Sequence, residues 1–183
     1  RREDLPSVRE AELRSVLKLY GAHSPILLGY RDQQLATADF DSLVARVVSA
    51  MEEVKPDVVI TFGPTGVSGH NDHIAIHRAT VEAHLRYRNA HQVESRLFYV
   101  AIAKEVAEEF RLHVHESELT PTVICDIKEQ VPLKIQGLRA YRSQEDAQQL
   151  ADMYATRPFD IEGFHQAHPR PADSGIAAGF WDD

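Results

Sequence analysis

The sequence predicts an α/β fold in which helices cover both faces of a mainly parallel β-sheet, giving three layers. Apolar runs of strand length alternate with helical patterns along the chain, and these runs are apolar at consecutive positions, as in strands buried on both faces. A glycine-rich loop joins one such run directly to a helix. With 183 residues, of which 43% are hydrophobic and 26% charged, we expect one globular domain over residues 1–183.

The first part of the chain predicts a helix, a strand and a second helix. Residues 6–20 carry apolar side chains at helical spacing, and Ser7 with Glu10 has the spacing of a capping box. Residues 25–30 are a short apolar run followed by polar residues, which predicts a strand that delivers a loop. Residues 40–54 have a long apolar stripe with helical period, which predicts a helix.

The middle of the chain has a strand, a glycine loop and a helix in immediate succession, at residues 57–62, 63–69 and 71–88. The pattern then predicts strands at 97–102 and 122–127, a helix at 103–111, and a helical segment at 131–154 with a break near 142–144. From about residue 158 prolines and glycines predict an irregular tail, with Pro169, Pro171, Gly175 and Gly179.

Composition limits the partners. Twenty basic against 28 acidic residues give a net charge of −8 without a basic cluster, so nucleic acid is not an expected partner. The apolar runs are far shorter than the ~20 residues that cross a bilayer, so no membrane span is expected. Cys125 is the single cysteine, which excludes an intrachain disulfide and fits a reducing, cytoplasmic location. A homo-oligomer stays an open alternative.

Four histidines share one stripe of the predicted helix that follows the glycine loop, namely His70, His73, His77 and His84. Ligands of open parallel sheets bind beyond the carboxyl ends of the strands, where this helix begins. We expect His77 and His84 to pack on the sheet or face solvent, because later turns lead away from that edge. His70 and His73, which flank Asp72, are the candidates for chemistry.

Two other motifs fit this segment less well. His73 and His77 have the i, i+4 spacing of the zinc-binding H-E-x-x-H helix, but the glutamate position holds Ile74, which cannot activate water. The loop at 63–69 lacks the Lys-Ser or Lys-Thr pair of a P-loop.

The segment from Gly66 to Thr80, G-V-S-G-H-N-D-H-I-A-I-H-R-A-T, resembles the G-x-x-G-H-P-D-H signature of the PIG-L/LmbE-like family of zinc-dependent N-acetylglucosamine deacetylases. Asn71 stands in place of the usual proline, and either residue can begin a helix. Three further segments follow the family's order, at 8–13, 27–35 and 134–144. The resemblance extends to about residue 145 and implies a Rossmann-like fold.

The family's first signature, A-H-P-D-D-E, is absent from the 183 residues. The resemblance implies that this motif provides two of three zinc ligands and the general base. We expect it, with the strand and helix that carry it, upstream of Arg1.

The resemblance also implies roles for five residues. His73 corresponds to the third protein ligand of the zinc, His70 to the imidazole facing the scissile amide, and Asp72 to the carboxylate that orients it. Arg9 and Asp32 correspond to residues that line the sugar pocket. Without the resemblance, Arg9 would be an ordinary charge on a helix surface, and Asp32 a turn residue.

The function implied by these residues is zinc-dependent removal of an N-acetyl or N-acyl group from an N-acetylglucosamine-type sugar or sugar conjugate, a small-molecule substrate. Two alternatives stay open. One is a noncatalytic sugar-binding or regulatory domain on the same fold, with an incomplete zinc site. The other is a site completed by a separate polypeptide that carries the first signature.

Overall fold

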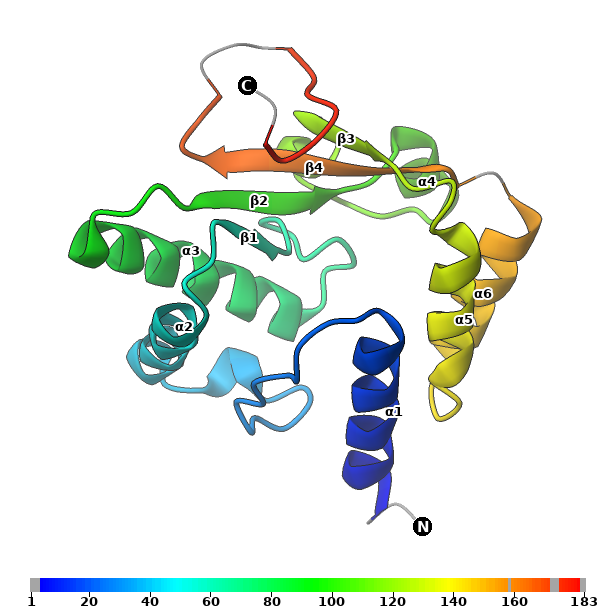
Figure 1. Cartoon of the computed structure of the whole chain (residues 1–183), viewed down its shortest axis with the longest axis horizontal. Helices are drawn as coiled ribbons and strands as arrows, with labels where there is room; N and C mark the ends of the chain where they lie inside the picture. The colour runs from blue at the N-terminus through cyan, green and yellow to red at the C-terminus, as the bar shows by residue number, and fades with distance from the viewer. Residues whose placement is uncertain (1–3, 158, 172–174, 182–183) are drawn as a thin grey trace. The chain divides into compact units, whose positions relative to one another are not determined.

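The computed structural model describes residues 4–157, 159–171 and 175–181, which form two compact units. The smaller unit comprises the described residues up to Leu27 together with Asp126–Ile161, and the larger unit Leu28–Cys125 with the described residues from Glu162 onward. Figure 1 shows the helices and strands of both units. The single domain expected from the chain length stays a prediction.

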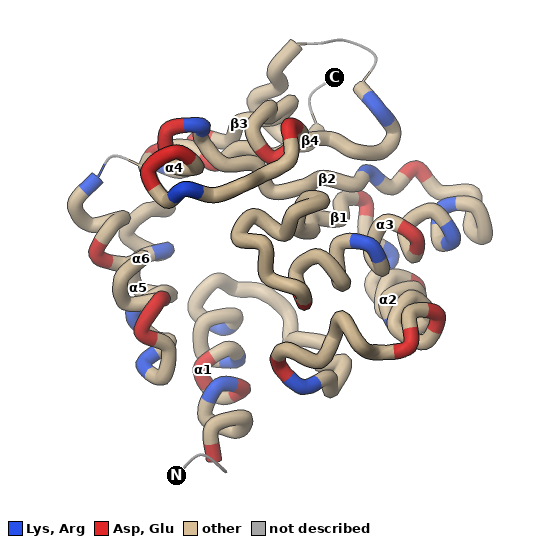
Figure 2. Tube along the Cα trace, turned by 180° about the vertical axis from the view of Figure 1, so that it is seen from behind, with Lys and Arg blue, Asp and Glu red and all other residues tan. Residues whose placement is uncertain are grey.

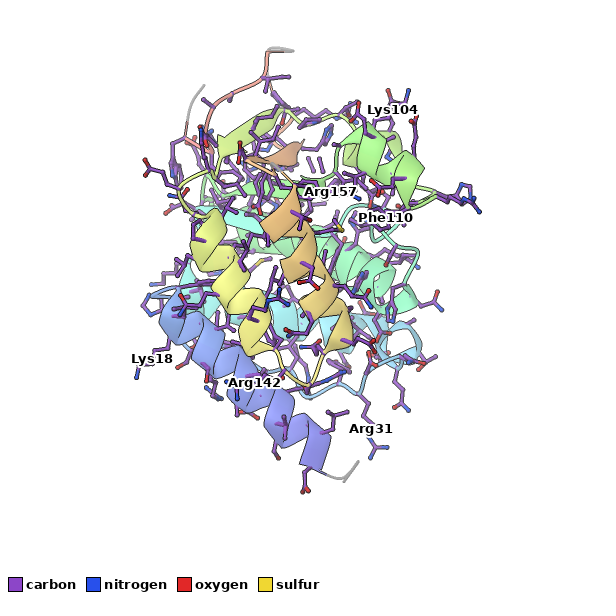
Figure 3. All side chains as sticks on the ribbon, turned by 90° about the vertical axis from the view of Figure 1, so that its right-hand side faces the viewer. Lys18, Arg31, Lys104, Phe110, Arg142 and Arg157 are labelled. Carbon is purple, nitrogen blue, oxygen red and sulfur yellow. The ribbon has the colours of Figure 1, made fainter. Side chains whose placement is uncertain are left out.

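The smaller unit is helical, with α1 (Leu5–Leu19), α5 (Val131–Ala140) and α6 (Glu145–Thr156). The carboxylate of Glu12 on α1 accepts hydrogen bonds from the Ser143 backbone N–H at 2.8 Å and its hydroxyl at 2.6 Å. A side chain at Gly137 would overlap the ring of Tyr20, so glycine lets the end of α1 approach α5. Exposed Lys18 and Arg142 project outward from this unit (Figure 3).

The sheet of the larger unit has four strands in the order β1-β2-β4-β3. Their bounds are β1 Val58–Thr61, β2 Arg96–Ala101, β3 Val123–Asp126 and β4 Ile161–His168. Strand β1 pairs with β2 in parallel, whereas β2 pairs with β4 antiparallel. The predicted α/β class is confirmed, and the sheet is mixed because β4 runs against β2.

Helices α2 (Phe40–Val54) and α3 (Asn71–His91) lie together on one face of this sheet (Figure 1), and the short α4 (Lys104–Glu109) follows β2. Ala79 and Ala83 are fully buried, and their small side chains let α2 pack closely on α3. The core between these helices contains Leu43, Val44, Val47, Met51, Ala79, Ala83 and Tyr87. Asp39 caps α2, accepting a hydrogen bond from the Ser42 N–H at 2.8 Å.

Charged residues of both signs alternate along the helices (Figure 2), which agrees with the absence of a basic cluster in the sequence. No helix in the described part of the chain combines the length and the apolar character that crossing a membrane requires.

Three local predictions differ from the structure. Residues 25–30 form no strand, because no strand of the described sheet lies beside them to pair with their backbone groups. Helix α1 begins at Leu5 after Asp4, so Ser7 lies inside the helix and the capping box was wrong. The tail from about residue 158 contains β4, which the sequence pattern did not indicate because polar residues interrupt its apolar ones. Pro169 and Pro171 come after the end of β4 at His168.

Candidate active site

The loop between β1 and α3 places the predicted residues at the carboxyl end of β1. Gly66 has φ +64° and Gly69 φ +75°, left-handed conformations that glycine adopts without steric cost. A side chain at Gly66 would also collide with His73, so this glycine lets the loop contact the first turn of α3. The loop therefore returns onto the first turn of the helix and lies against His73.

His70 is the N-cap residue of α3. Its Nδ1 accepts a hydrogen bond from the backbone N–H of Asp72 at 3.2 Å. An imidazole nitrogen that accepts carries no proton, so in the neutral ring the proton lies on Nε2. His70 therefore presents an N–H donor from its outer nitrogen.

In His73, one turn later, the ring proton lies on the other nitrogen, Nδ1. Its Nδ1 is 3.1 Å from the carbonyl oxygen of Gly66, which can only accept, so we infer that Nδ1 donates and that Nε2 has a free lone pair. Phe62 stacks on the ring at 3.9 Å between centroids and 7° between planes, which fixes its orientation. A backbone carbonyl that holds Nδ1–H while Nε2 is free is the usual environment of a metal-binding histidine.

The rings of His70 and His73 lie side by side, with centroids 4.9 Å apart. One ring thus offers a proton donor and its neighbour a lone pair, both half-buried at the same helix start. The pair can bind a metal at one position and donate to a ligand at the other.

Asp72 uses its side chain differently from the expected role. Its carboxylate accepts hydrogen bonds from the backbone N–H groups of Gln33 at 2.6 Å and Leu35 at 3.1 Å. The group that holds the His70 ring is the Asp72 backbone N–H. An orienting role for the Asp72 carboxylate therefore stays a prediction.

The two predicted sugar-binding residues lie in different units. Asp32 is exposed in the turn directly before Gln33, so the carboxylate of Asp72 anchors the segment that carries it. Arg9 is exposed on α1 in the smaller unit.

His73 fits one position of a zinc site, since a neutral imidazole with a free Nε2 is a preferred zinc ligand. Among residues 4–157, 159–171 and 175–181, no three His, Cys, Asp or Glu side chains group closely enough to hold a metal ion. The remaining ligands expected from the family's first signature belong to the motif that the 183 residues lack.

Sequence reasoning missed Glu118, in the 3-10 turn Glu116–Glu118 after α4. Its side chain is fully buried and accepts four hydrogen bonds, from the Thr65 N–H and hydroxyl, the Val67 N–H and the His115 N–H. Burial alone would raise the pKa of Glu118, but these hydrogen bonds outweigh it and lower the pKa below its usual value. The spacing of His115 and Glu118, which form a capping box, was the local feature that could have drawn attention to Glu118.

His77 and His84 pack on the sheet, as expected. The Nδ1 of His77 lies 2.8 Å from the Phe62 carbonyl oxygen, and its ring meets the Tyr99 ring edge-on at 4.9 Å. His84 is fully buried, with its ring 5.7 Å from that of His168. Burial lowers the pKa of both, and that of His84 to about 4, so these rings are neutral at pH 7.

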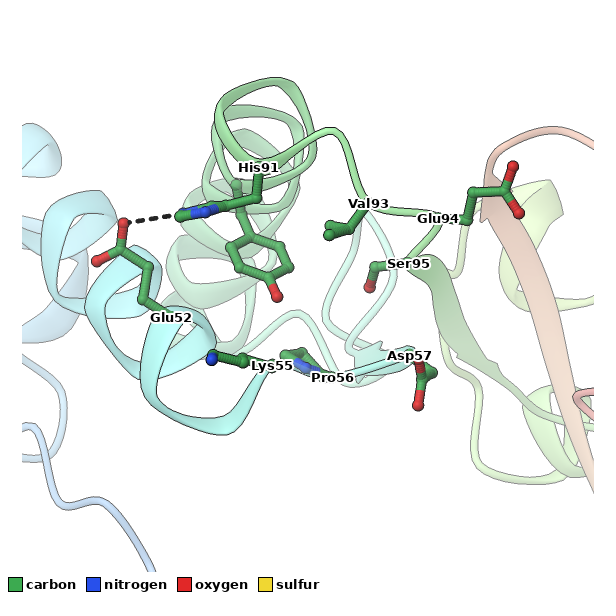
Figure 4. A pocket seen from close by; sticks show the side chains of 9 residues that line it. Glu52, Lys55, Pro56, Asp57, His91, Val93, Glu94 and Ser95 are labelled. Carbon is green, nitrogen blue, oxygen red and sulfur yellow. Dashed lines mark hydrogen bonds and ion pairs between the residues drawn. The ribbon is translucent and has the colours of Figure 1, made fainter.

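A cavity of about 440 Å³ lies at the amino ends of β1 and β2 rather than beside His70 (Figure 4). Its lining includes Lys55 and Asp57 before β1, Ser95 before β2, and the side chains of Glu52 and His91, which are hydrogen-bonded at 3.2 Å. None of the five residues implied by the resemblance lines it.

Comparisons with known proteins find similarity to N-deacetylases. Residues 1–84 match the PIG-L family, described as GlcNAc-PI de-N-acetylase. The chain is 32% identical over 145 residues, 79% of its length and 61% of the relative, to a probable N-acetyl-alpha-D-glucosaminyl L-malate deacetylase 2 of Bacillus subtilis. It is 38% identical over 97 residues, 44% of its length and 33% of the relative, to a 1D-myo-inositol 2-acetamido-2-deoxy-alpha-D-glucopyranoside deacetylase of Rhodococcus jostii.

Two solved structures share the fold. The conserved protein TT1542 from Thermus thermophilus has a TM-score of 0.67 and 24% identity, over 92% of this chain and 76% of that one. The hydratase GalB of Pseudomonas putida has a TM-score of 0.63 and 15% identity, over 94% of this chain and 76% of that one. The chain spans about three fifths of the Bacillus subtilis relative, 61% of its length. The match over residues 1–84 and the similarity to these deacetylases agree with the resemblance of the sequence to the PIG-L/LmbE-like family.

Proposed function

We propose that this chain acts in a zinc-dependent N-deacetylase, which hydrolyses the acetamide of an N-acetylglucosamine-type sugar conjugate. The observation that carries the proposal is the opposite arrangement of the two neighbouring rings, with a donor at His70 Nε2 and a lone pair at His73 Nε2. The printed names of the Bacillus and Rhodococcus relatives describe deacetylases of glucosaminyl malate and glucosaminyl inositol compounds.

His73 would hold the zinc through Nε2, together with the histidine and aspartate that the family's first signature provides. Zinc held there would lower the pKa of a bound water to about 7 and would polarise the amide carbonyl. The Gly66 carbonyl keeps the His73 proton on Nδ1, so that the Nε2 lone pair stays available for the metal.

His70 would act on the substrate. Its Nε2–H donates a hydrogen bond to the oxygen that becomes negative when the carbonyl carbon is attacked. The proton for the departing amine, which must leave as a neutral group, would come from the general base of the first signature, which takes it from the attacking water. The backbone N–H of Asp72 fixes the His70 ring for its task as donor.

Substrate positioning would depend on Asp32 and Arg9. A carboxylate accepts from sugar hydroxyls and a guanidinium donates to them, so each of the two side chains has the chemistry to bind a sugar. The segment that carries Asp32 is tied to the first turn of α3 through Asp72. This link would keep the sugar contact at a fixed distance from His70 and His73.

The test uses the intact protein loaded with zinc and N-acetylglucosaminyl malate, with release of the free amine as the measurement. We expect amine release that requires zinc, and a zinc content near one per chain that His73→Ala lowers. The exposed His23→Ala is the matched control and should retain zinc.

Two results would overturn the proposal. Unchanged zinc content in His73→Ala would remove His73 from the ligand set. Saturable sugar binding without amine release would support the noncatalytic sugar-binding or regulatory alternative instead.

A further inference from the structure

The loop before α3 contains a residue in an unfavourable backbone conformation. Val67 has φ +62°, in the left-handed region that β-branched residues rarely adopt. Its N–H donates to Oε1 of Glu118 at 2.9 Å. A conformation of this kind persists only where the surroundings hold it, and the carboxylate of Glu118 does so beside the backbone hydrogen bonds within residues 63–69.

Glu118 holds the other side of Gly66 as well. The N–H of Thr65 donates to Oε2 at 3.2 Å, and the hydroxyl of Thr65 donates to the same oxygen. The two residues that flank Gly66 are therefore both bound to one carboxylate, although Glu118 lies more than 50 positions further along the chain. A side chain at Gly63 would overlap Glu118, so the loop lies directly on the carboxylate.

The carbonyl of Gly66, between these two bound residues, accepts from Nδ1 of His73. This carbonyl belongs to the same peptide unit as the Val67 N–H, so the bond from that N–H to Glu118 helps to fix its direction, together with the Ser68 N–H, which donates to the same carbonyl oxygen at 2.7 Å. A continuous path of hydrogen bonds thus runs from the buried carboxylate through the 65–67 backbone to the imidazole proton of His73.

We infer that Glu118 is a positioning residue for His73, which keeps the proton on Nδ1 and so leaves Nε2 free to bind metal. The inference rests on the proposed function for the metal-binding role of His73. Glu118 is fully buried, and both oxygens accept hydrogen bonds from protein groups. It therefore acts through the loop rather than on a substrate.

The test compares Glu118→Gln with Glu116→Gln, in the protein without added metal. Glu116 belongs to the same 3-10 turn but is exposed, so its substitution removes the same charge at a matched place. A glutamine at 118 has one oxygen acceptor and turns an NH2 group toward at least one N–H donor of the loop. The loop should loosen while the fold is retained.

The direct measurement is the protonation state of His73, read from the ¹⁵N chemical shifts of its ring nitrogens. We expect protonation at Nδ1 in the unaltered protein and in Glu116→Gln, and a mixture of both tautomers in Glu118→Gln. Zinc binding, measured by competition with a chromophoric chelator, should weaken about 10- to 100-fold in Glu118→Gln, the range found when the partner of a metal-bound histidine is lost.

Unchanged ring shifts together with zinc affinity within about twofold of the unaltered protein in Glu118→Gln would overturn the inference. If Glu118→Gln does not fold, Thr65→Val serves instead, because it removes one hydroxyl donor and keeps the carboxylate. Thr65→Val should change the ¹⁵N shifts of the His73 ring in the same direction as Glu118→Gln, but by less. Unchanged ring shifts in Thr65→Val would also contradict the inference. Unchanged zinc binding in His73→Ala would contradict the proposed function alone, because the ring shifts do not depend on metal.

Discussion

The carboxylate of Asp72 accepts a hydrogen bond from the backbone N–H of Gln33 at 2.6 Å, joining residues 39 positions apart. The second oxygen accepts from the N–H of Leu35 at 3.1 Å. One side chain on the first turn of α3 therefore holds the segment that carries Asp32, while its backbone holds the ring of His70.

Asp72→Asn should loosen the segment at residues 33–35. An asparagine side chain has one acceptor, so one of the two N–H groups loses its partner, at a cost of about 1–2 kcal/mol. We expect faster amide hydrogen exchange at Gln33 or Leu35 and a lower unfolding temperature. Asp41→Asn, on the exposed first turn of α2, is the control and should leave exchange at both amides unchanged.

His70 can be separated into its capping and chemical roles by two substitutions. His70→Ala removes the N-cap acceptor as well as the imidazole, and should lower the free energy of unfolding by about 1 kcal/mol. His70→Asn retains an acceptor for the Asp72 N–H but has no imidazole proton to donate. The asparagine variant should therefore keep most of the stability.

Both His70 variants should bind zinc normally and release amine about 10² to 10³ times more slowly, which is the effect of losing one oxyanion donor. Elemental analysis and turnover of an N-acetyl sugar conjugate check the two parts. Loss of zinc along with activity would show that His70 is a ligand, and the division of roles with His73 would be wrong.

Regular elements with strong local patterns could be predicted from the sequence. The stripe of α2 gave its bounds, Phe40–Val54, and the succession of strand, glycine loop and helix gave β1 and α3. Strand β4 could not be recognised, because its partner β2 lies about 65 positions earlier and half of its own residues are polar.

In the site, too, local patterns could be predicted and contacts between distant residues could not. His70 and His73 belong to a local motif and could be found by their spacing. Glu118 contacts Thr65 and Val67 across more than 50 positions, and only the folded chain brings them together. The backbone partners of Asp72 were hidden for the same reason.

The buried His84 predicts how stability depends on pH. Burial, then His168 and Arg88, lower its pKa from 6.5 to about 4. The unfolded chain therefore takes up a proton near pH 6.5 that the folded chain refuses, so this ring costs stability as pH falls from 6.5 toward 4. At about 1.36 kcal/mol per pH unit, the loss approaches 3 kcal/mol.

His84→Leu should reduce that dependence, because leucine fills the buried site without a titrating group. Urea unfolding at pH 7, 5.5 and 4.5 measures the effect, and the variant should lose less stability on acidification than the unaltered protein. The exposed His23→Leu is the control and should leave the pH dependence unchanged. Parallel pH profiles for His84→Leu and the unaltered protein would show that His84 is not responsible.

Asp32 gives the sharpest test of how the sugar is held. Its carboxylate can accept from sugar hydroxyls, and it lies next to the segment that Asp72 anchors to the first turn of α3. Asp32→Ala should raise KM for an N-acetylglucosamine conjugate, and lower kcat where the ring must be held for attack, with zinc content unchanged. Hydrogen exchange at Gln33 should stay as in the unaltered protein, because that amide binds Asp72 rather than Asp32.

A small acetamide without the sugar provides the matched substrate for Asp32→Ala. It has no hydroxyls to contact, so removing the carboxylate should leave its slower hydrolysis nearly unchanged. A loss confined to the sugar substrate would therefore assign Asp32 to recognition of the ring. Equal losses on both substrates would mean that Asp32 supports the metal site or the fold, because the lost contact would then be one that both reactions need.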